Sequence, residues 1–265
     1  MTVAGVGLAL ACGCGEKVLT VVGRCPDGGA FSPSVGCAPP GLLDDLVGYW
    51  KLDDATGSTI AHDLTGRNDG TLVNLDPATA WITGRAAGGL AVEGGGFVNV
   101  PTSPSIDSIT DQVTIAGWGN LDAGSTIMDY ATIASREEGT TINQHYHISV
   151  NSRGELPAMW IKTADSNWLL QGPKAVTRQT WFHIAGTYDG TTGHLYVDGQ
   201  EVASQAMTGR FVAETVPLIL GANGNGVGDA NVTERFPGKI DEIMLYRRAL
   251  SAAEIAQLHD GALFR

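Results

Sequence analysis

The chain has 265 residues, 43% of them hydrophobic, and its 36 glycines are spread along it without a repeat. This is enough apolar material for one large or two small packed domains. The formal net charge is −12, with 28 acidic against 16 basic residues. A negative field repels nucleic acid and anionic lipid, so we expect neither as a partner. The same field disfavours strongly polyanionic glycans, unless a local basic pocket or a metal ion overrides it.

The extreme N-terminus differs in composition from the rest of the chain. Residues 2–11 form an apolar run that is too short to span a bilayer but suits the h-region of a secretory signal. Ala9-Leu10-Ala11 fits a small-x-small cleavage site, and Cys12 follows it as in a bacterial lipoprotein signal. No Lys or Arg precedes the run, so a buried strand is the alternative. We expect an exported protein, secreted, periplasmic or on the outer surface, with Cys12 as a candidate for lipidation.

All four cysteines lie within the first 37 residues. In an oxidising compartment Cys25 and Cys37 could close a small loop that is rich in Pro and Gly. Lipidation of Cys12 would leave one of the other three cysteines without a partner. The C-x-C spacing followed by two distant cysteines does not match a zinc site. We therefore rank a disulfide between Cys25 and Cys37 first, a lipid anchor second and a metal site third.

Turn-forming Pro and Gly residues and the alternation of apolar residues indicate one large domain after this segment. Pro39-Pro40-Gly41 marks a break, so we assign residues 1–43 to a signal and tether, and residues 44–265 to one domain. Short alternating apolar runs recur in that domain with turn residues between them, which predicts an all-β antiparallel sandwich. The expected strands are 46–52, 70–75, 90–92, 97–100, 113–121, 131–135, 146–151, 156–162, 168–171, 180–188, 194–197, 218–221 and 238–246.

One helix is predicted near the C-terminus. Ser251 and Glu254 have the spacing of a capping box, in which the Ser hydroxyl and the Glu carboxylate each accept a backbone N–H. Ile255 and Leu258 then fall on one face, and Gly261 is placed to end the helix. We expect a short helix that packs its apolar face on the sandwich.

Five sequence blocks, in chain order, resemble those of the laminin G-like (concanavalin A-like) jelly rolls. The blocks are residues 46–53 (LVGYWKLD), 62–72 (HDLTGRNDGTL), 113–118 (VTIAGW), 179–202 (QTWFHIAGTYDGTTGHLYVDGQEV) and 236–251 (FPGKIDEIMLYRRALS). The resemblance spans about residues 46–258 and implies two curved antiparallel sheets packed face to face, a jelly-roll sandwich with a short C-terminal helix.

A calcium site is a further expectation. Asp63, Asn68, Asp69 and the carbonyls around Gly66 supply hard oxygen ligands on a tight turn, which suits Ca²⁺. The resemblance adds Asp241, because the first and last strands of such jelly rolls lie side by side, and it implies a structural rather than catalytic ion. The alternative is a turn in which Asp63 caps backbone amides without any ion.

Candidate ligand-binding residues lie on predicted loops. Trp168, beside Asp165 and Asn167, is the best candidate for a rim aromatic that stacks on a sugar, since Trp50, Trp118 and Trp181 lie in strand motifs expected to bury them. Tyr130, Tyr146 and Trp160 lie near other rims. A second polar loop, Ala222–Glu234, holds Asn223, Asn225 and Asp229, and is either a binding rim or a flexible hairpin loop.

Catalytic patterns are weak. The polar residues of 179–202 alternate along predicted strands or lie in predicted turns, so they indicate a structural framework rather than a catalytic role. A retaining glycosidase needs two carboxylates on the same face of a sheet. Asp241 and Glu242 are adjacent, so their side chains point to opposite faces, and the acidic pair at 137–138 falls in an expected loop. His145 and His147 share a face, which would suit a metal or a general base, but we expect a solvent-facing pair.

These observations predict a non-catalytic binding module, for a carbohydrate or a cell-surface protein, with Ca²⁺ stabilising the fold. A polysaccharide hydrolase or lyase on the same fold is the first alternative. A purely structural interaction module is the second. Membrane contact is expected only through the candidate lipid anchor.

Overall fold

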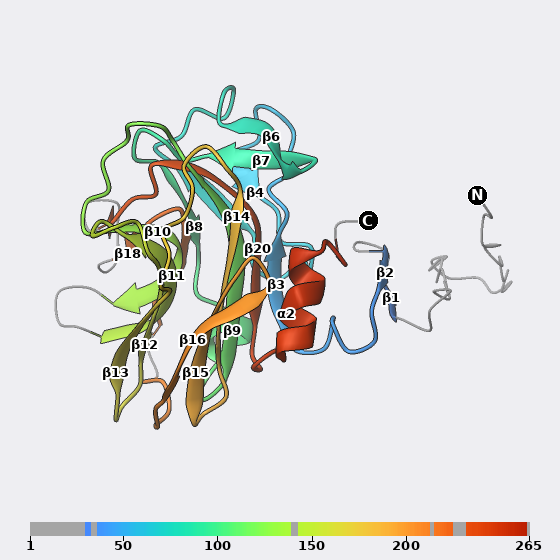
Figure 1. Ribbon diagram of the computed structural model, residues 1–265. Helices are drawn as coiled ribbons and strands as arrows, with labels where there is room; N and C mark the ends of the chain where they lie inside the picture. The colour runs from blue at the N-terminus through green and yellow to red at the C-terminus, as the bar shows by residue number, and fades with distance from the viewer. Residues whose placement is uncertain (1–29, 33–35, 139–142, 213–214, 225–231, 264–265) are drawn as a thin grey trace, which may run out of the picture.

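The computed structural model describes residues 30–32, 36–138, 143–212, 215–224 and 232–263. Two antiparallel sheets pack face to face, and an eight-residue helix lies against the outside of one of them (Figure 1). The architecture is the predicted jelly-roll sandwich. No helix in the described part of the chain is both long enough and apolar enough to cross a membrane.

Each sheet combines consecutive strands with strands that are distant in sequence. Sheet I, in spatial order, consists of β13 (Asn167–Gln171), β12 (Pro157–Lys162), β11 (Asn143–Asn151), β10 (Tyr130–Glu138), β17 (Leu218–Leu220), β8 (Phe97–Val100), β5 (Gly70–Val73) and β4 (Ile60–Ala61). Sheet II consists of β16 (Gln200–Ala206), β15 (Thr192–Val197), β14 (Phe182–Tyr188), β9 (Val113–Leu121), β20 (Gly238–Tyr246), β7 (Gly88–Ala91) and β6 (Trp81–Ala86), with β3 (Leu46–Trp50) also paired to β20. The remaining elements are the pairs β1 (Ala30–Ser32) with β2 (Gly36–Ala38) and β18 (Asn223–Gly224) with β19 (Val232–Thr233), and the helices α1 (Pro104–Asp107) and α2 (Ala252–His259).

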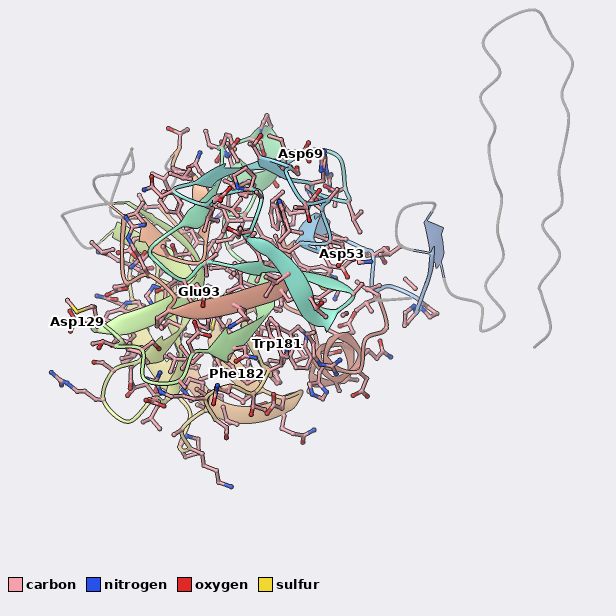
Figure 2. The ribbon with its side chains drawn as sticks, turned by 90° about the horizontal axis from the view of Figure 1, so that it is seen from above. Asp53, Asp69, Glu93, Asp129, Trp181 and Phe182 are labelled. Atoms are coloured by element: carbon pink, nitrogen blue, oxygen red, sulfur yellow. The ribbon has the colours of Figure 1, made fainter. Side chains whose placement is uncertain are left out.

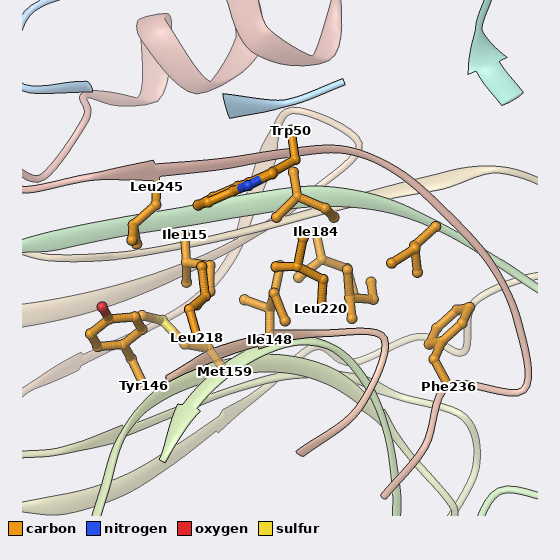
Figure 3. Close-up of a cluster of buried hydrophobic side chains, with 14 of the residues drawn as sticks. Trp50, Ile115, Tyr146, Ile148, Met159, Ile184, Leu218, Leu220, Phe236 and Leu245 are labelled. Carbon is orange, nitrogen blue, oxygen red and sulfur yellow. The ribbon is translucent and has the colours of Figure 1, made fainter. Parts of the chain in front are cut away.

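The main core lies between the sheets, as period-two alternation requires. Figure 3 shows Ile115, Ile184 and Leu245 of sheet II facing Ile148 and other apolar side chains of sheet I. These side chains are fully buried. Burying one side chain of this size is worth about 1.5–3 kcal/mol, so this layer is the main source of stability.

The outer face of sheet II is covered by α2. Tyr49, Met244 and Tyr246 from the sheet form a second apolar cluster with Ile255 and Leu258 of the helix. The predicted capping box is confirmed, because Ser251 accepts the Glu254 amide while the Glu254 carboxylate accepts the Ser251 amide. This face is therefore occupied and unavailable to a ligand.

The framework interpretation of residues 179–202 is also confirmed. Phe182 and Ile184 of β14 point into the core between the sheets, and Ala185 points to the α2 side. Asp198 accepts the amide of His183 at 2.9 Å, and Asp189 accepts the amide of Thr192 at 2.7 Å. Both aspartates are turn formers.

In the described part of the chain, no helix covers the outer face of sheet I. The short β18–β19 pair packs over one part of it, where Phe97 and Ile219 meet Ala222 and Val232 (Figure 1). The Ser135 hydroxyl fixes this pair to β10, donating to the Ala222 carbonyl at 3.1 Å and accepting the Gly224 amide at 3.3 Å. The part of this outer face that β10, β11, β12 and β13 form is the part where we look for a ligand site.

Candidate functional site

The outward residues of β10 and β11 are polar and nevertheless buried. In the register, Ser135 pairs with His147 and Ala134 with Ile148, so the first pair faces out and the second faces the core. The outward set is Thr132, Ser135, Glu137, His147 and Ser149, each at most 4% exposed. A row of buried polar side chains on the outside of a sheet does not arise from core packing, which makes it a functional-site candidate.

Many atoms of this row lack a hydrogen-bond partner. Among the described residues, thirteen buried side-chain N or O atoms have no partner, and six of them lie here. The six are Thr132 Oγ1, Glu137 Oε2, His147 Nδ1 and Nε2, Ser149 Oγ and, on β18, Asn223 Oδ1. An unmade bond of this kind costs roughly 1–3 kcal/mol, so their concentration on one face needs a reason other than stability.

A recess of about 420 Å³ opens beside this row. We call it the Trp160 recess; its lining includes Asp129, Tyr130, Arg153, Trp160, Leu169 and Glu234. The rings of Tyr130 and Trp160 are half-buried and meet edge to face, with centroids 6.0 Å apart and an interplanar angle of 82°. The His147 ring lies 6.0 Å from each of them, so the aromatic wall continues into the buried polar row.

Glu234 closes one side of the recess. Its backbone carbonyl accepts the Thr132 amide at 3.0 Å, which places it beside β10. Its carboxylate accepts a hydrogen bond from Asn223 Nδ2 at 2.8 Å. Burial raises the pKa of Glu234, the nearby Glu137 carboxylate adds to this effect, and His147 and Asn223 oppose it. Proton affinity is therefore higher here than on an exposed glutamate.

The predicted rim tryptophan lies elsewhere. Trp168 is 41% exposed, but it pairs with Ile161, whose side chain points into the core between the sheets. The next residue, Leu169, pairs with Trp160 and lines the recess. Trp168 is thus on the opposite face of β13. Asn167 supports the site indirectly by accepting the Trp160 indole N–H.

The other predicted ligand-binding residues have different outcomes. Asp165 is exposed in the turn before β13, where its amide donates to the Thr163 hydroxyl at 3.3 Å. Asn223 belongs to the site through Glu234. Asn225 and Asp229 lie outside the described residues, as do Cys12 and Cys25, and only the backbone of Cys37 is described, in β2.

A second recess of about 480 Å³ lies around the loop before β14. We call it the Trp181 recess; its lining includes Pro173, Lys174, Trp181, Glu201 and Val202. Trp181 is half-buried, not fully buried as its strand motif predicts. None of the thirteen unpartnered buried atoms in the described residues belongs to the lining of either recess. His147, which carries two of them, contacts Tyr130 and Trp160 of the Trp160 recess, so that recess is the stronger candidate.

The predicted calcium ligands do not converge. Both carboxylate oxygens of Asp63 accept hydrogen bonds from donors: Oδ1 from the amides of Tyr49 and Thr65, and Oδ2 from the Thr65 hydroxyl and the amides of Arg67 and Asn68. The amide oxygen of Asn68 accepts from Ser103 and Ser105. Oxygens saturated by N–H and O–H groups do not fit a cation, so the turn alternative describes Asp63 and Gly66 better.

Asp241 is separated from that turn by β3. Trp50 pairs with Ile243 of β20 and bridges to Asp63 on its other side. Asp241 is completely buried; its Oδ2 accepts the amides of Arg85 and Ala86, and its Oδ1 has no partner among the described residues. Burial, opposed by these amides and assisted by Asp53, raises the pKa of Asp241 to about 8. Asp69 is exposed, and its Oδ1 accepts the Asp63 amide at 2.8 Å. Of the predicted side-chain ligands that are buried in the described structure, Asp241 alone keeps an unpartnered oxygen. No cluster of three or more His, Cys, Asp or Glu side chains surrounds a metal position in the described part of the chain.

Three residues of the site escaped the sequence interpretation. Glu137 was expected in a loop, but β10 continues through it to Glu138. A register shift between Arg136 and Glu137 hides its place in the alternation. His147 was expected to face solvent and is 1% exposed. Glu234 was the last residue of a predicted polar loop. The alternation of polar residues on both β10 and β11 was the available signal.

A family comparison decides the classification. The model of the concanavalin A-like lectin/glucanases superfamily, Laminin_G_3, matches residues 92–256. The chain belongs to this superfamily. The superfamily match includes β10, β11 and β12, which carry the Trp160 recess. A search of curated proteins gives no match.

Solved structures of similar fold include enzyme domains and binding modules. Domain 4 of AbnA, a GH43 extracellular arabinanase from Geobacillus stearothermophilus in complex with arabinotriose, is 18% identical with a TM-score of 0.58, covering 81% of this chain and 98% of that one. The CBM40 of the Ruminococcus gnavus IT-sialidase, bound to alpha2,3 sialyllactose, is 20% identical with a TM-score of 0.53, covering 64% and 96%. The match to Trypanosoma rangeli sialidase, 17% identical with a TM-score of 0.58, covers 84% of this chain but 34% of that enzyme. At these identities the likeness establishes the fold alone.

Proposed function

We propose that this protein is a non-catalytic carbohydrate-binding module whose site is the Trp160 recess on the outer face of sheet I. The observation that carries the proposal is the contact of one His147 ring with both Tyr130 and Trp160. It joins an aromatic surface to a row of unpartnered polar groups. Two of the similar structures were solved with bound oligosaccharides, which supports a glycan as the ligand class.

The chemistry of a sugar ring suits this combination. A pyranose has an apolar C–H face that packs on an aromatic ring and hydroxyl groups around its edge that donate and accept hydrogen bonds. The half-buried rings of Tyr130 and Trp160 provide the first contact. Glu234 and Asn151, which also line the recess, provide polar groups at its edge. A recess of about 420 Å³ is in the usual size range for small-molecule sites.

A glycoside hydrolase is the second candidate, and one observation favours it. Glu137 and Glu234 lie near the same imidazole, and burial raises the pKa of Glu234, as in a proton donor. However, Glu137 is 4% exposed and does not belong to the described lining of the recess. A hydrolase needs both carboxylates beside the scissile bond, so binding without cleavage accounts better for the geometry.

We further propose that Ca²⁺, when present, binds at Asp241. A buried carboxylate with a free oxygen and a raised pKa is a site where a divalent cation offsets the cost of ionisation. The ion would have a structural role. The signal and tether predicted from the sequence of residues 1–43 lead us to propose action outside the cytoplasm, secreted or anchored at the surface.

A glycan array tests the function. The full chain is applied with Ca²⁺ and with a chelator, and each glycan that binds is then incubated with the protein and analysed for shorter products. We expect binding of at least one oligosaccharide without cleavage. Cleavage that is lost in Glu234→Gln would establish the hydrolase instead. Binding of a cell-surface protein but of no glycan would make the chain an interaction module.

A further inference from the structure

The charged groups of the Trp160 recess are unbalanced. Asp129 and Glu234 line it, and Arg153, which is exposed, is the only basic residue in its described lining. Glu137 lies behind the aromatic wall with Oε2 unpartnered. Figure 2 shows Asp129 on the opposite side of the sandwich from Asp53, whose carboxylate interacts with Asp241, so Asp129 is separate from the Asp241 region.

The basic residues next to these glutamates point away from the recess. Arg136 precedes Glu137, but its guanidinium donates to the carbonyls of Ile106 and Val216 and pairs with Asp107. Arg235 follows Glu234, but it donates to the Gly95 carbonyl and lies 5.5 Å from the Phe97 ring centroid.

Lys162 and His147 are two further basic side chains near the recess. Lys162 lies two residues beyond Trp160 on β12, outside the described lining of the recess. His147 is 1% exposed and lies 3.8 Å from Glu137. Neither group brings a positive charge into the part of the recess that is open to a ligand.

This arrangement has a direct consequence for the ligand. An anionic sugar would place its carboxylate near Asp129 and Glu234, in a protein of net charge −12, with Arg153 as the single basic side chain of the described lining to set against these two carboxylates. An ammonium group in the same place would neutralise the carboxylates and could donate several charge-assisted hydrogen bonds.

We propose that the Trp160 recess selects glycans that carry a free, protonated amino group, such as glucosamine residues of a de-N-acetylated polysaccharide, and rejects uronic and sialic acids. The inference rests on the proposed glycan-binding function. It assigns Glu234 the role of ammonium acceptor, with Asn223 holding its carboxylate at 2.8 Å, and Trp160 the role of stacking surface. Selectivity comes from charge, and affinity for the sugar ring comes from the aromatic contact.

Matched oligosaccharides test the selectivity. Calorimetry measures binding of a glucosamine trimer, of the N-acetylglucosamine trimer that differs only in its acetyl groups, and of a galacturonic acid trimer, at a pH where the amines are protonated. We expect the glucosamine trimer to bind at least tenfold more tightly than the acetylated trimer, and the acidic trimer to bind no better than either. Glu234→Gln should remove most of the preference, while Glu201→Gln, in the Trp181 recess, should keep it.

Attraction between an acidic protein and any polycation must be separated from this selectivity. Trp160→Ala leaves the net charge unchanged, so bulk attraction would survive it, whereas binding in the recess should fall at least tenfold. Survival of glucosamine binding in Trp160→Ala would overturn the inference, as would equal affinity for the acetylated trimer. The glycan-binding function would stand in the second case, and binding of no glycan would overturn both. Melting temperatures of the variants confirm that each is folded.

Discussion

Oε2 of Glu137 lies 3.8 Å from Nδ1 of His147, and the two side chains are 4% and 1% exposed. Neither atom has a hydrogen-bond partner among the described residues. A buried pair of this kind contributes little to stability, because desolvation offsets the attraction between its members. In the proposed function its part is to support the aromatic wall, because the His147 ring contacts both Tyr130 and Trp160.

Removing the pair should therefore separate stability from binding. In Glu137→Leu/His147→Leu we expect the melting temperature to stay the same or rise by a few degrees, while glycan affinity falls at least tenfold. The control is Arg178→Leu/Glu155→Leu, which removes a partly exposed ion pair in which Arg178 also binds the Asp122 carbonyl. That control should melt lower and bind normally. A large drop in melting temperature for the first variant with unchanged binding would assign the pair to the fold.

The raised pKa of Glu234 predicts a pH-dependent stability difference. Because burial favours the neutral carboxyl in the folded protein, ionisation destabilises the fold as the pH rises above the ordinary glutamate range. Glu234→Gln keeps a neutral group, so it should match the wild type near pH 4 and melt higher at pH 7. Melting curves from pH 4 to pH 8 measure the difference, and a constant difference would contradict the burial of this carboxylate.

Asp241 provides the test for calcium. Without a cation, stability should fall as the pH rises toward about 8, because the neutral form of Asp241 is favoured in the fold. Ca²⁺ should raise the melting temperature of the wild type, and more strongly at higher pH. Asp241→Asn should melt as high as the wild type in chelator and gain nothing from Ca²⁺. Glu93→Gln is the control, because it removes an exposed carboxylate that lies 3.9 Å from Lys239, a residue on the same strand as Asp241. An equal gain in Asp241→Asn would exclude this residue as a ligand.

The Asp63 turn should matter with or without calcium. Asp63→Ala leaves four backbone amides and the Thr65 hydroxyl without their acceptor, so we expect the free energy of unfolding to fall by about 3 kcal/mol or more. Denaturant unfolding in chelator and in Ca²⁺ should give the same loss. Asp54→Ala, which removes a contact with the exposed His62, should cost much less. A loss seen only in Ca²⁺ would restore Asp63 as a ligand.

Local sequence patterns predict most of the sandwich because they determine its local structure. The strands at 97–100, 113–121 and 238–246 begin and end where predicted, since each is an apolar run bounded by turn residues. β16 was not expected, because its residues are mostly exposed and polar at the edge of sheet II. The capping box of α2 is a local motif and needs no tertiary information.

The site is less predictable for a physical reason. Trp160 and Trp168 look equivalent in sequence, and only the pairing of β12 with β13 places Trp160 beside Leu169 on the outer face and Trp168 on the other. Glu234 joins His147 through the β18–β19 pair, which is a tertiary contact without a local signal. The calcium prediction rested on residue types that favour Ca²⁺, whereas the hydrogen bonds of the Asp63 carboxylate, with backbone amides from its own turn and from β3, are set by the fold.

The central claim is that the Trp160 recess binds glycan. The most direct measurement is the affinity, by titration calorimetry, of the best array ligand for the wild type, Trp160→Ala and Trp181→Ala. The two variants each remove one half-buried tryptophan from a recess of similar size. We predict that Trp160→Ala weakens binding at least tenfold, a loss of about 1.4 kcal/mol or more, while Trp181→Ala binds like the wild type. Normal binding in Trp160→Ala together with loss in Trp181→Ala would contradict the account and move the site to the Trp181 recess.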